Sequence, residues 1–99
     1  MSCLRALANL AKAEATAFKR YTEYIAHGDK DPGHAKALGQ AKKKLDDAIK
    51  DVKKYCNCEL LKEGSKIVAV LASAEALAEK IVDALRQFCS EDPEFCYAW

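Results

Sequence analysis

The sequence predicts an all-α fold, an antiparallel up-down-up three-helix bundle that ends in a short helical turn. Among its 99 residues, 18 Ala and 10 Leu stand against only four Val and four Ile, a usage typical of helices. Apolar residues recur at spacings of three and four in three long segments. Gly and Pro separate these segments, so a single domain over residues 1–99 with a modest core is expected.

A first helix is predicted over residues 2–26. Ser2 is a suitable N-cap, and Gly28 suits the position just after the helix. Asp31 followed by Pro32 then suits the start of the next helix. The stripe expected to face the core comprises Leu4, Leu7, Ala8, Ala11, Ala15, Phe18, Thr22 and Ile25.

A second helix is predicted over residues 34–63. Its apolar stripe comprises Leu38, Ala41, Leu45, Ala48, Ile49, Val52, Cys56 and Leu60. This stripe keeps its phase if the helix continues through Asn57. The alternative is an end near Cys56 with a turn at Asn57, but Gly64 and Ser65 form a stronger stop and start signal. We therefore expect a continuous second helix.

A third helix is predicted over residues 66–89 from its apolar periodicity. The break before it is very short, so the second and third helices are expected to be antiparallel neighbours. Its expected core stripe comprises Ile67, Val70, Leu71, Ala74, Leu77, Ala78, Ile81, Leu85 and Phe88. The run Ser90-Glu91-Asp92-Pro93-Glu94 repeats the cap-then-Pro pattern, which predicts a helical turn over about residues 92–97.

The five cysteines divide into two groups in this topology. Cys3, Cys56 and Cys58 lie at one end of the bundle, whereas Cys89 and Cys96 lie at the other. At a rise of about 1.5 Å per residue, Cys3 and Cys58 lie at similar heights along neighbouring helices, which favours a Cys3–Cys58 disulfide. The second favoured disulfide is Cys89–Cys96, and Cys56 is then a buried thiol. Free cysteines packed as small apolar residues are the alternative, and an unpaired thiol could also link two chains.

A metal site is the weakest of the candidate sites. His27 and His34 flank the first break, at the end of the bundle that holds Cys89 and Cys96, so the four residues are candidate ligands for zinc or haem. None of them has the His or Cys spacing that presents two ligands to one ion, and capping explains His and Asp in loops. No metal and no cofactor are therefore expected.

The second helix carries a basic face formed by Lys36, Lys43, Lys50 and Lys54. Such a row could contact phosphates, but Asp residues lie among the lysines at ion-pairing distances, as on a solvated helix face. With a net charge of only +1, nucleic acid is an unlikely partner.

Several function classes lack the residues that they need. No nucleophile with its base, phosphate-binding glycine loop or dinucleotide fingerprint is present, so catalysis is not expected. The longest apolar run, residues 67–72, is far shorter than the roughly 20 residues of a membrane span. No secretory signal precedes the first helix, and a soluble monomer without a membrane partner is expected.

Over nearly its whole length the chain resembles de novo designed helical bundles. The resemblance lies in Asp31-Pro32 and Asp92-Pro93 at helix starts, Gly28 and Gly64 at helix ends, and helices filled with Ala, Leu and Lys. It implies a structural scaffold without an evolved substrate. The alternatives are a small protein-binding module that presents a helix face to a partner, and the metal or haem binder described above.

Overall fold

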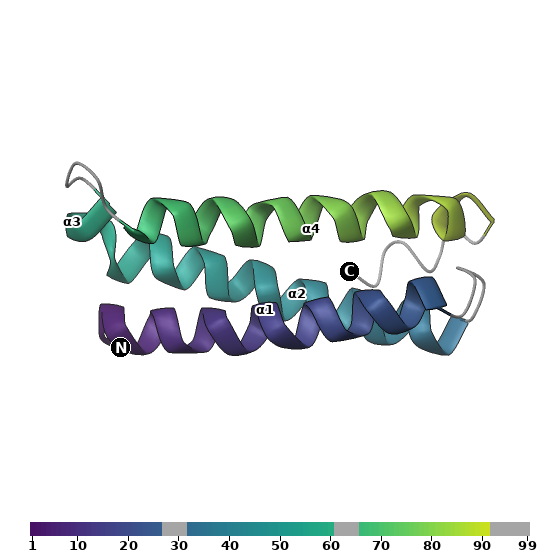
Figure 1. The fold of residues 1–99 in the computed structure, drawn as a ribbon, viewed down its shortest axis with the longest axis horizontal. Helices are drawn as coiled ribbons and strands as arrows, with labels where there is room; N and C mark the ends of the chain where they lie inside the picture. Colours follow the sequence, from purple (N-terminus) through teal and green to yellow (C-terminus); the bar gives the residue numbers. More distant parts are fainter. Residues whose placement is uncertain (27–31, 61–65, 92–99) are drawn as a thin grey trace.

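The computed structural model describes residues 1–26, 32–60 and 66–91, and in these ranges every regular element is a helix. The helices are α1 (Cys3–Ala26), α2 (Pro32–Tyr55), α3 (Asn57–Leu60) and α4 (Lys66–Glu91). The three long helices lie side by side with alternating direction, so α1 and α4 run parallel (Figure 1). This confirms the predicted up-down-up bundle. The turn predicted over residues 92–97 lies outside the described residues.

Helix α1 begins where its N-cap predicts. The Ser2 hydroxyl accepts a hydrogen bond from the backbone N–H of Arg5 at 3.1 Å, and the Ser2 carbonyl accepts one from the N–H of Ala6 at 3.0 Å. The Ser2 side chain thereby satisfies the Arg5 N–H, which has no partner within the helix, and the Ala6 N–H makes the first backbone hydrogen bond of the helix.

The prediction of a continuous second helix over residues 34–63 was wrong. Helix α2 begins at Pro32, ends at Tyr55, and is separated by a turn at Cys56 from the single turn α3. The Cys56 N–H still bonds to the Val52 carbonyl at 2.9 Å, so the helical ladder ends there. Asn57 follows at once, and Asn side chains compete for backbone hydrogen bonds at helix ends. The stripe remained in phase across the break, so periodicity alone could not detect it.

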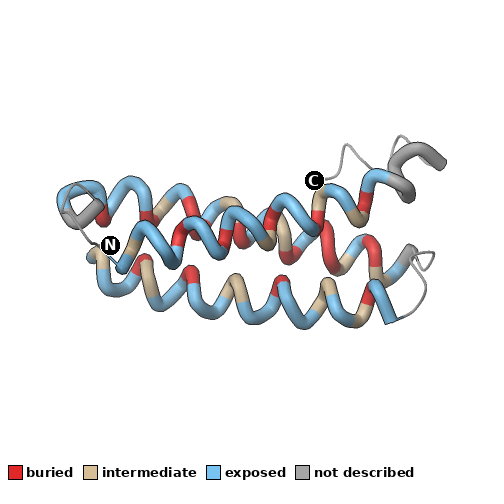
Figure 2. Tube along the Cα trace, turned by 45° about the horizontal axis from the view of Figure 1, so that its top comes forward, coloured by how far each residue is buried: buried red, intermediate tan, exposed pale blue. Residues whose placement is uncertain are grey.

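Helix α2 provides the centre of the core. It packs on both α1 and α4, and α1 packs more extensively on α2 than on α4. Every buried side chain in the described ranges is apolar apart from the hydroxyl of Tyr24. Figure 2 shows these buried positions along the facing sides of the helices. The predicted α2 stripe is confirmed at Leu38, Ala41, Leu45, Ala48, Ile49, Val52 and Cys56.

The predicted core stripe of α1 was wrong by a rotation of the helix. The residues that α1 buries fully are Ala6, Leu10, Ala17 and Tyr24. Seven of the eight side chains predicted to be in the core are exposed instead, among them Leu4 by 79%, Phe18 by 61% and Ile25 by 45%. Of the predicted stripe, Leu7 alone is half-buried against the core. Helix α1 is apolar on two adjacent faces, and Ala residues on both leave the hydrophobic pattern undecided.

Helix α4 largely matches the prediction. Leu71, Ala74, Ala78, Ile81 and Leu85 are buried, and Ile67 and Leu77 are half-buried against the core. Val70, which is predicted to belong to the core stripe, is 39% exposed. Phe88 and Leu60 belong to the part of the chain whose side chains are not described.

Candidate interaction groove on the first helix

An uncovered apolar face runs along the length of α1. We name it the α1 seam; its residues are Leu4, Ala8, Ala11, Ala15, Phe18, Thr22 and Ile25, all of them exposed. Successive members are alternately four and three residues apart, which is the spacing of the apolar positions in a coiled coil. In the described structure no other helix covers this face.

A groove lies beside the seam, between α1 and α4. It has a volume of about 570 Å³ and is lined from α1 by Ala11, Ala15 and Phe18, among others. From α4 it is lined by Ser73, Ala76, Leu77 and Lys80. Small side chains on both helices leave this space open, because α1 packs closely on α2 and only lightly on α4.

Two hydrogen bonds fix the register of the groove walls. The Ser73 hydroxyl on α4 donates to the Glu14 carboxylate on α1 at 3.1 Å. Further along, the Tyr24 hydroxyl donates to the carbonyl of Ala84 at 3.2 Å. Both pairs are offset by about sixty positions in sequence, as expected for two parallel helices in contact over this length. The walls are therefore held at fixed relative heights.

A row of basic residues borders the seam on its other side. Arg5, Lys12 and Lys19 recur every seven residues, each one position after a seam residue, and all three are exposed. In the described ranges none of them pairs with an acidic side chain, unlike Arg20, which pairs with Glu23 at 3.1 Å. Lys80 adds a fourth positive charge at the α4 wall, against one carboxylate, Glu14. The seam is thus bordered by three basic residues on one side, and the groove on its other side carries Lys80 and Glu14.

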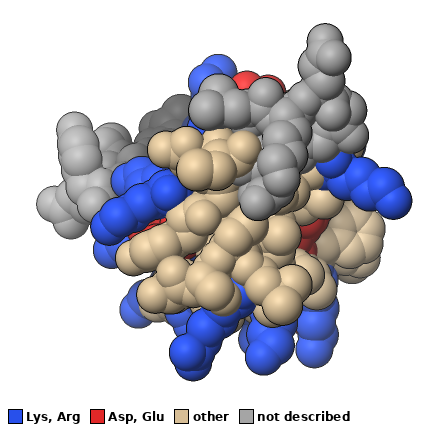
Figure 3. All heavy atoms as spheres, turned by 90° about the vertical axis from the view of Figure 1, so that its left-hand side faces the viewer, with Lys and Arg blue, Asp and Glu red and all other residues tan. Residues whose placement is uncertain are grey.

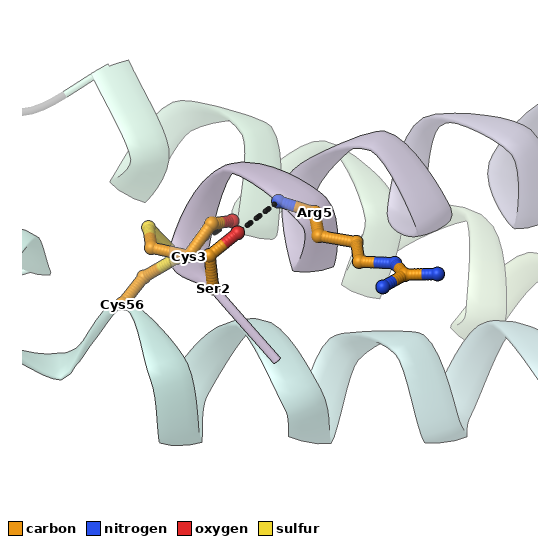
Figure 4. Close-up of a disulfide and its surroundings, with 4 residues drawn as sticks. All are labelled: Ser2, Cys3, Arg5 and Cys56. Carbon is orange, nitrogen blue, oxygen red and sulfur yellow. Dashed lines mark hydrogen bonds between the residues drawn. A yellow bond between two sulfur atoms is a disulfide. The ribbon is translucent and has the colours of Figure 1, made fainter.

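The structure joins a different pair of cysteines from the one expected. Cys3 forms its disulfide with Cys56, not with Cys58, and the two Cα atoms lie 4.8 Å apart (Figure 4). Cys56, expected to be a free buried thiol, is the partner, whereas Cys58 is a free exposed thiol. The expected heights identified the correct end of the bundle but not the correct cysteine, because Cys56 in the turn after α2 is fully buried, whereas Cys58 is exposed.

The second expected disulfide lies outside the described side chains. Cys89 belongs to α4, but its side chain is not described, and Cys96 lies beyond the described residues. His27 also lies outside them. His34 is half-buried in the first turn of α2 and lines a shallow hollow with Arg20 and Glu23. Among the described residues no three His, Cys, Asp or Glu side chains are grouped so that they could hold a metal ion.

The four lysines of the basic face on α2 are all exposed. One of them, Lys54, lies over the ring of Tyr55 with 5.2 Å to its centroid. Asp46 pairs with Lys42, and Lys53 pairs with Glu75 of α4 at 2.7 Å. Figure 3, which views the end of the bundle with α3, shows Lys and Arg side chains around the edge of an uncharged centre. The four lysines thus lie on a solvated face, and the ion pairs of α2 in the described ranges are formed by Lys42 and Lys53 instead.

Comparison with known proteins found no matching family model, curated protein or solved structure. In the described ranges, no helix combines the length and apolar character that a membrane crossing requires.

Proposed function

We propose that this chain is a small protein-binding module without catalytic activity, and that it binds its partner through the α1 seam. The observation that supports this most is the exposure of Phe18, an aromatic side chain that is 61% accessible at the edge of an apolar groove. Isolated exposed apolar residues are common, but contiguous apolar patches beside a groove are typical of interaction sites. Buried aromatic anchors also contribute much of the binding energy in protein interfaces.

The scaffold hypothesis is the alternative. In it, the chain is a monomeric bundle of designed origin that only has to fold, and the seam is surface without a role. The apolar core and the disulfide support a stable fold in either case. The seam favours the binding module, because a scaffold has no need for an exposed Leu, Phe and Ile on one helix face.

The test compares capture of proteins from a lysate by three purified chains: the wild type, Phe18→Glu and Val68→Glu. Val68 is a matched control because it is 51% exposed on α4 and does not line the groove. We expect a protein held by the wild type and by Val68→Glu to be lost with Phe18→Glu. The same protein, purified, should bind the wild type in calorimetry with one site per chain.

The result against the proposal is equally clear. If all three chains capture the same proteins, the seam is not the binding surface and the scaffold hypothesis is favoured. Circular dichroism and urea unfolding of each variant show whether a loss of capture is due to a loss of folding. Both substitutions are at exposed positions, so the free energy of unfolding should change by only about 0.5 kcal/mol.

A further inference from the structure

We infer that the partner contributes a single amphipathic α-helix with acidic residues beside its apolar stripe, and that this helix lies along the α1 seam against α4. The bound assembly is then a four-helix bundle in which three helices come from this chain. This inference rests on the proposed function and specifies the partner's chemistry. It is carried by the spacing of the seam, the shape of the groove and the charges at its edges.

The spacing of the seam is that of a surface made for another helix. Alternating steps of three and four residues keep an apolar row facing a neighbouring helix along a coiled coil. A strand or a loop has no such period. From Leu4 to Ile25 the seam is about 31 Å long at 1.5 Å per residue, enough for about six turns of a helix. An element of this length matches the seam along its whole extent.

The sizes of the seam side chains indicate how close that helix comes. Ala8, Ala11 and Ala15 occupy the middle, so a partner backbone can approach α1 closely there. Leu4 and Phe18 stand on either side of this alanine stretch and are strongly exposed. The partner's own large side chains have a place in the open groove between α1 and α4. Large residues of each helix thereby meet small residues or space on the other.

The charges at the edges select the partner's polar residues. Arg5, Lys12 and Lys19 occupy the positions that flank a coiled-coil seam, where opposite charges set the choice of partner. Lys80 stands at the α4 wall, and the one groove carboxylate, Glu14, already accepts a hydrogen bond from Ser73. A helix with Asp or Glu beside its stripe is attracted to this row, and one with Lys or Arg is repelled.

A second copy of the chain fits poorly in charge. If two seams packed antiparallel, the two basic rows would face each other, with Lys12 opposite Lys12. If they packed parallel, the row would meet Leu7, Glu14 and Tyr21, which include one acid.

The experiment uses two synthetic helical peptides of about 25 residues that share a Leu stripe at coiled-coil spacing. One has Glu and the other Lys at the flanking positions. Each is titrated into the full chain, at concentrations where the peptide alone is monomeric by sedimentation. Three surface ion pairs, each worth a few tenths to one kcal/mol, predict that the Glu peptide binds the wild type roughly tenfold more tightly than the Lys peptide.

Two triple variants with the same change in net charge sharpen the result. Arg5→Glu with Lys12→Glu and Lys19→Glu should reverse the preference, so that the Lys peptide binds more tightly. Lys36→Glu with Lys43→Glu and Lys50→Glu alters the basic face of α2 by as many charges, away from the seam, and should keep the wild-type preference. The preference should also shrink as salt is raised from 0.05 to 1 M, because screening weakens exposed pairs.

Several outcomes would overturn the inference. If both peptides bind equally, the basic row does not select the partner's charge. If neither peptide binds, the partner is not a helix of this kind. Either can occur while Phe18→Glu still abolishes capture of a lysate protein, so the proposed function would survive. A wild-type dimer in sedimentation that Phe18→Glu dissociates would make a second copy the occupant. Tighter peptide binding after removal of residues 92–99 would assign the groove to the chain's own end.

Discussion

At the scale of single residues, Tyr24 does the most to fix the rotation of α1. It is fully buried, it lies seven residues beyond the buried Ala17, and its hydroxyl donates to the Ala84 carbonyl of α4 at 3.2 Å. A buried phenol needs such a partner, since an unsatisfied hydroxyl in the core is costly. The orientation of α1 that buries Tyr24 leaves the adjacent Ile25 at the surface. The other residues of the α1 seam are exposed on the same face.

Tyr24→Phe is expected to lower the free energy of unfolding by about 1 kcal/mol, because it removes the hydroxyl and keeps the ring packed. Urea unfolding followed by circular dichroism measures this change. Tyr55→Phe is the matched control: Tyr55 is 38% exposed, so this substitution should lower the free energy of unfolding by less than about 0.5 kcal/mol. Equal effects of the two substitutions would contradict the role assigned to the Tyr24 hydroxyl.

The disulfide between Cys3 and Cys56 is the second residue-scale determinant. It joins positions 53 apart in sequence, so its reduction should destabilise the chain by about 4 kcal/mol through loop entropy. The comparison is made in a Cys89→Ser/Cys96→Ser background, with and without reductant, by urea unfolding. Replacing Cys58 by Ser there should leave the oxidised chain unchanged. Loss of the reductant effect with Cys58→Ser would instead restore the sequence-based pairing of Cys3 with Cys58.

At the scale of elements, α1 shows where the sequence is informative and where it is not. Its start and its N-cap were predictable, because the Ser2 cap is a signal in the local sequence. Its buried face was not. Two apolar rows lie next to each other, and the choice between them is made by long-range contacts, the Cys56 disulfide and the Ala84 hydrogen bond. In α2 only one apolar row exists, and there the predicted core is correct.

A pair of leucines on α1 tests which row is buried. Leu10 is fully buried and Leu4 is 79% exposed, so Leu10→Ala should cost about 2 to 5 kcal/mol and Leu4→Ala less than about 0.5. Both substitutions remove the same atoms and introduce the same residue, and each variant serves as the control for the other in urea unfolding. A larger loss of unfolding free energy for Leu4→Ala than for Leu10→Ala would support the orientation of α1 that the sequence predicts.

The N-cap is a second element-scale test. Ser2→Ala removes the acceptor for the Arg5 N–H and should lower the free energy of unfolding by about 1 kcal/mol. Ser2→Asp keeps an acceptor at the same place and should retain most of the stability. The measurement is again urea unfolding. A loss of equal size in both variants would mean that the hydroxyl has a role other than capping.

At the scale of the whole molecule, the helices are not held equally. Helix α2 packs on both neighbours, and the disulfide adds a covalent constraint between α1 and α2, whereas α4 packs mainly on α2. We expect native-state hydrogen exchange, read by mass spectrometry of peptides, to show opening of α4 at a lower free energy than α1 and α2. Opening of all three helices at one common free energy would contradict this ranking.

The candidate site belongs to this same scale, which is why the sequence did not reveal it. The apolar pattern of the sequence predicts that Leu4, Ala15 and Phe18 belong to the core. They form a surface only because α1 turns its other apolar row inward and α4 stands partly away from it. The one signal that was available is the basic row at Arg5, Lys12 and Lys19, whose seven-residue repeat follows the seam.

The disulfide also changes what a cut in the backbone can do. Because it joins the start of α1 to the turn after α2, the segment from Cys3 to Cys56 is a closed covalent ring, and α4 is a branch outside it. A protease that nicks the ring between the two helices releases nothing until a reductant is added. A nick between Cys56 and the start of α4 instead cuts the backbone that joins α4 to the ring. Helix α4, which forms one wall of the groove, is then held to the ring by packing and no longer by the backbone.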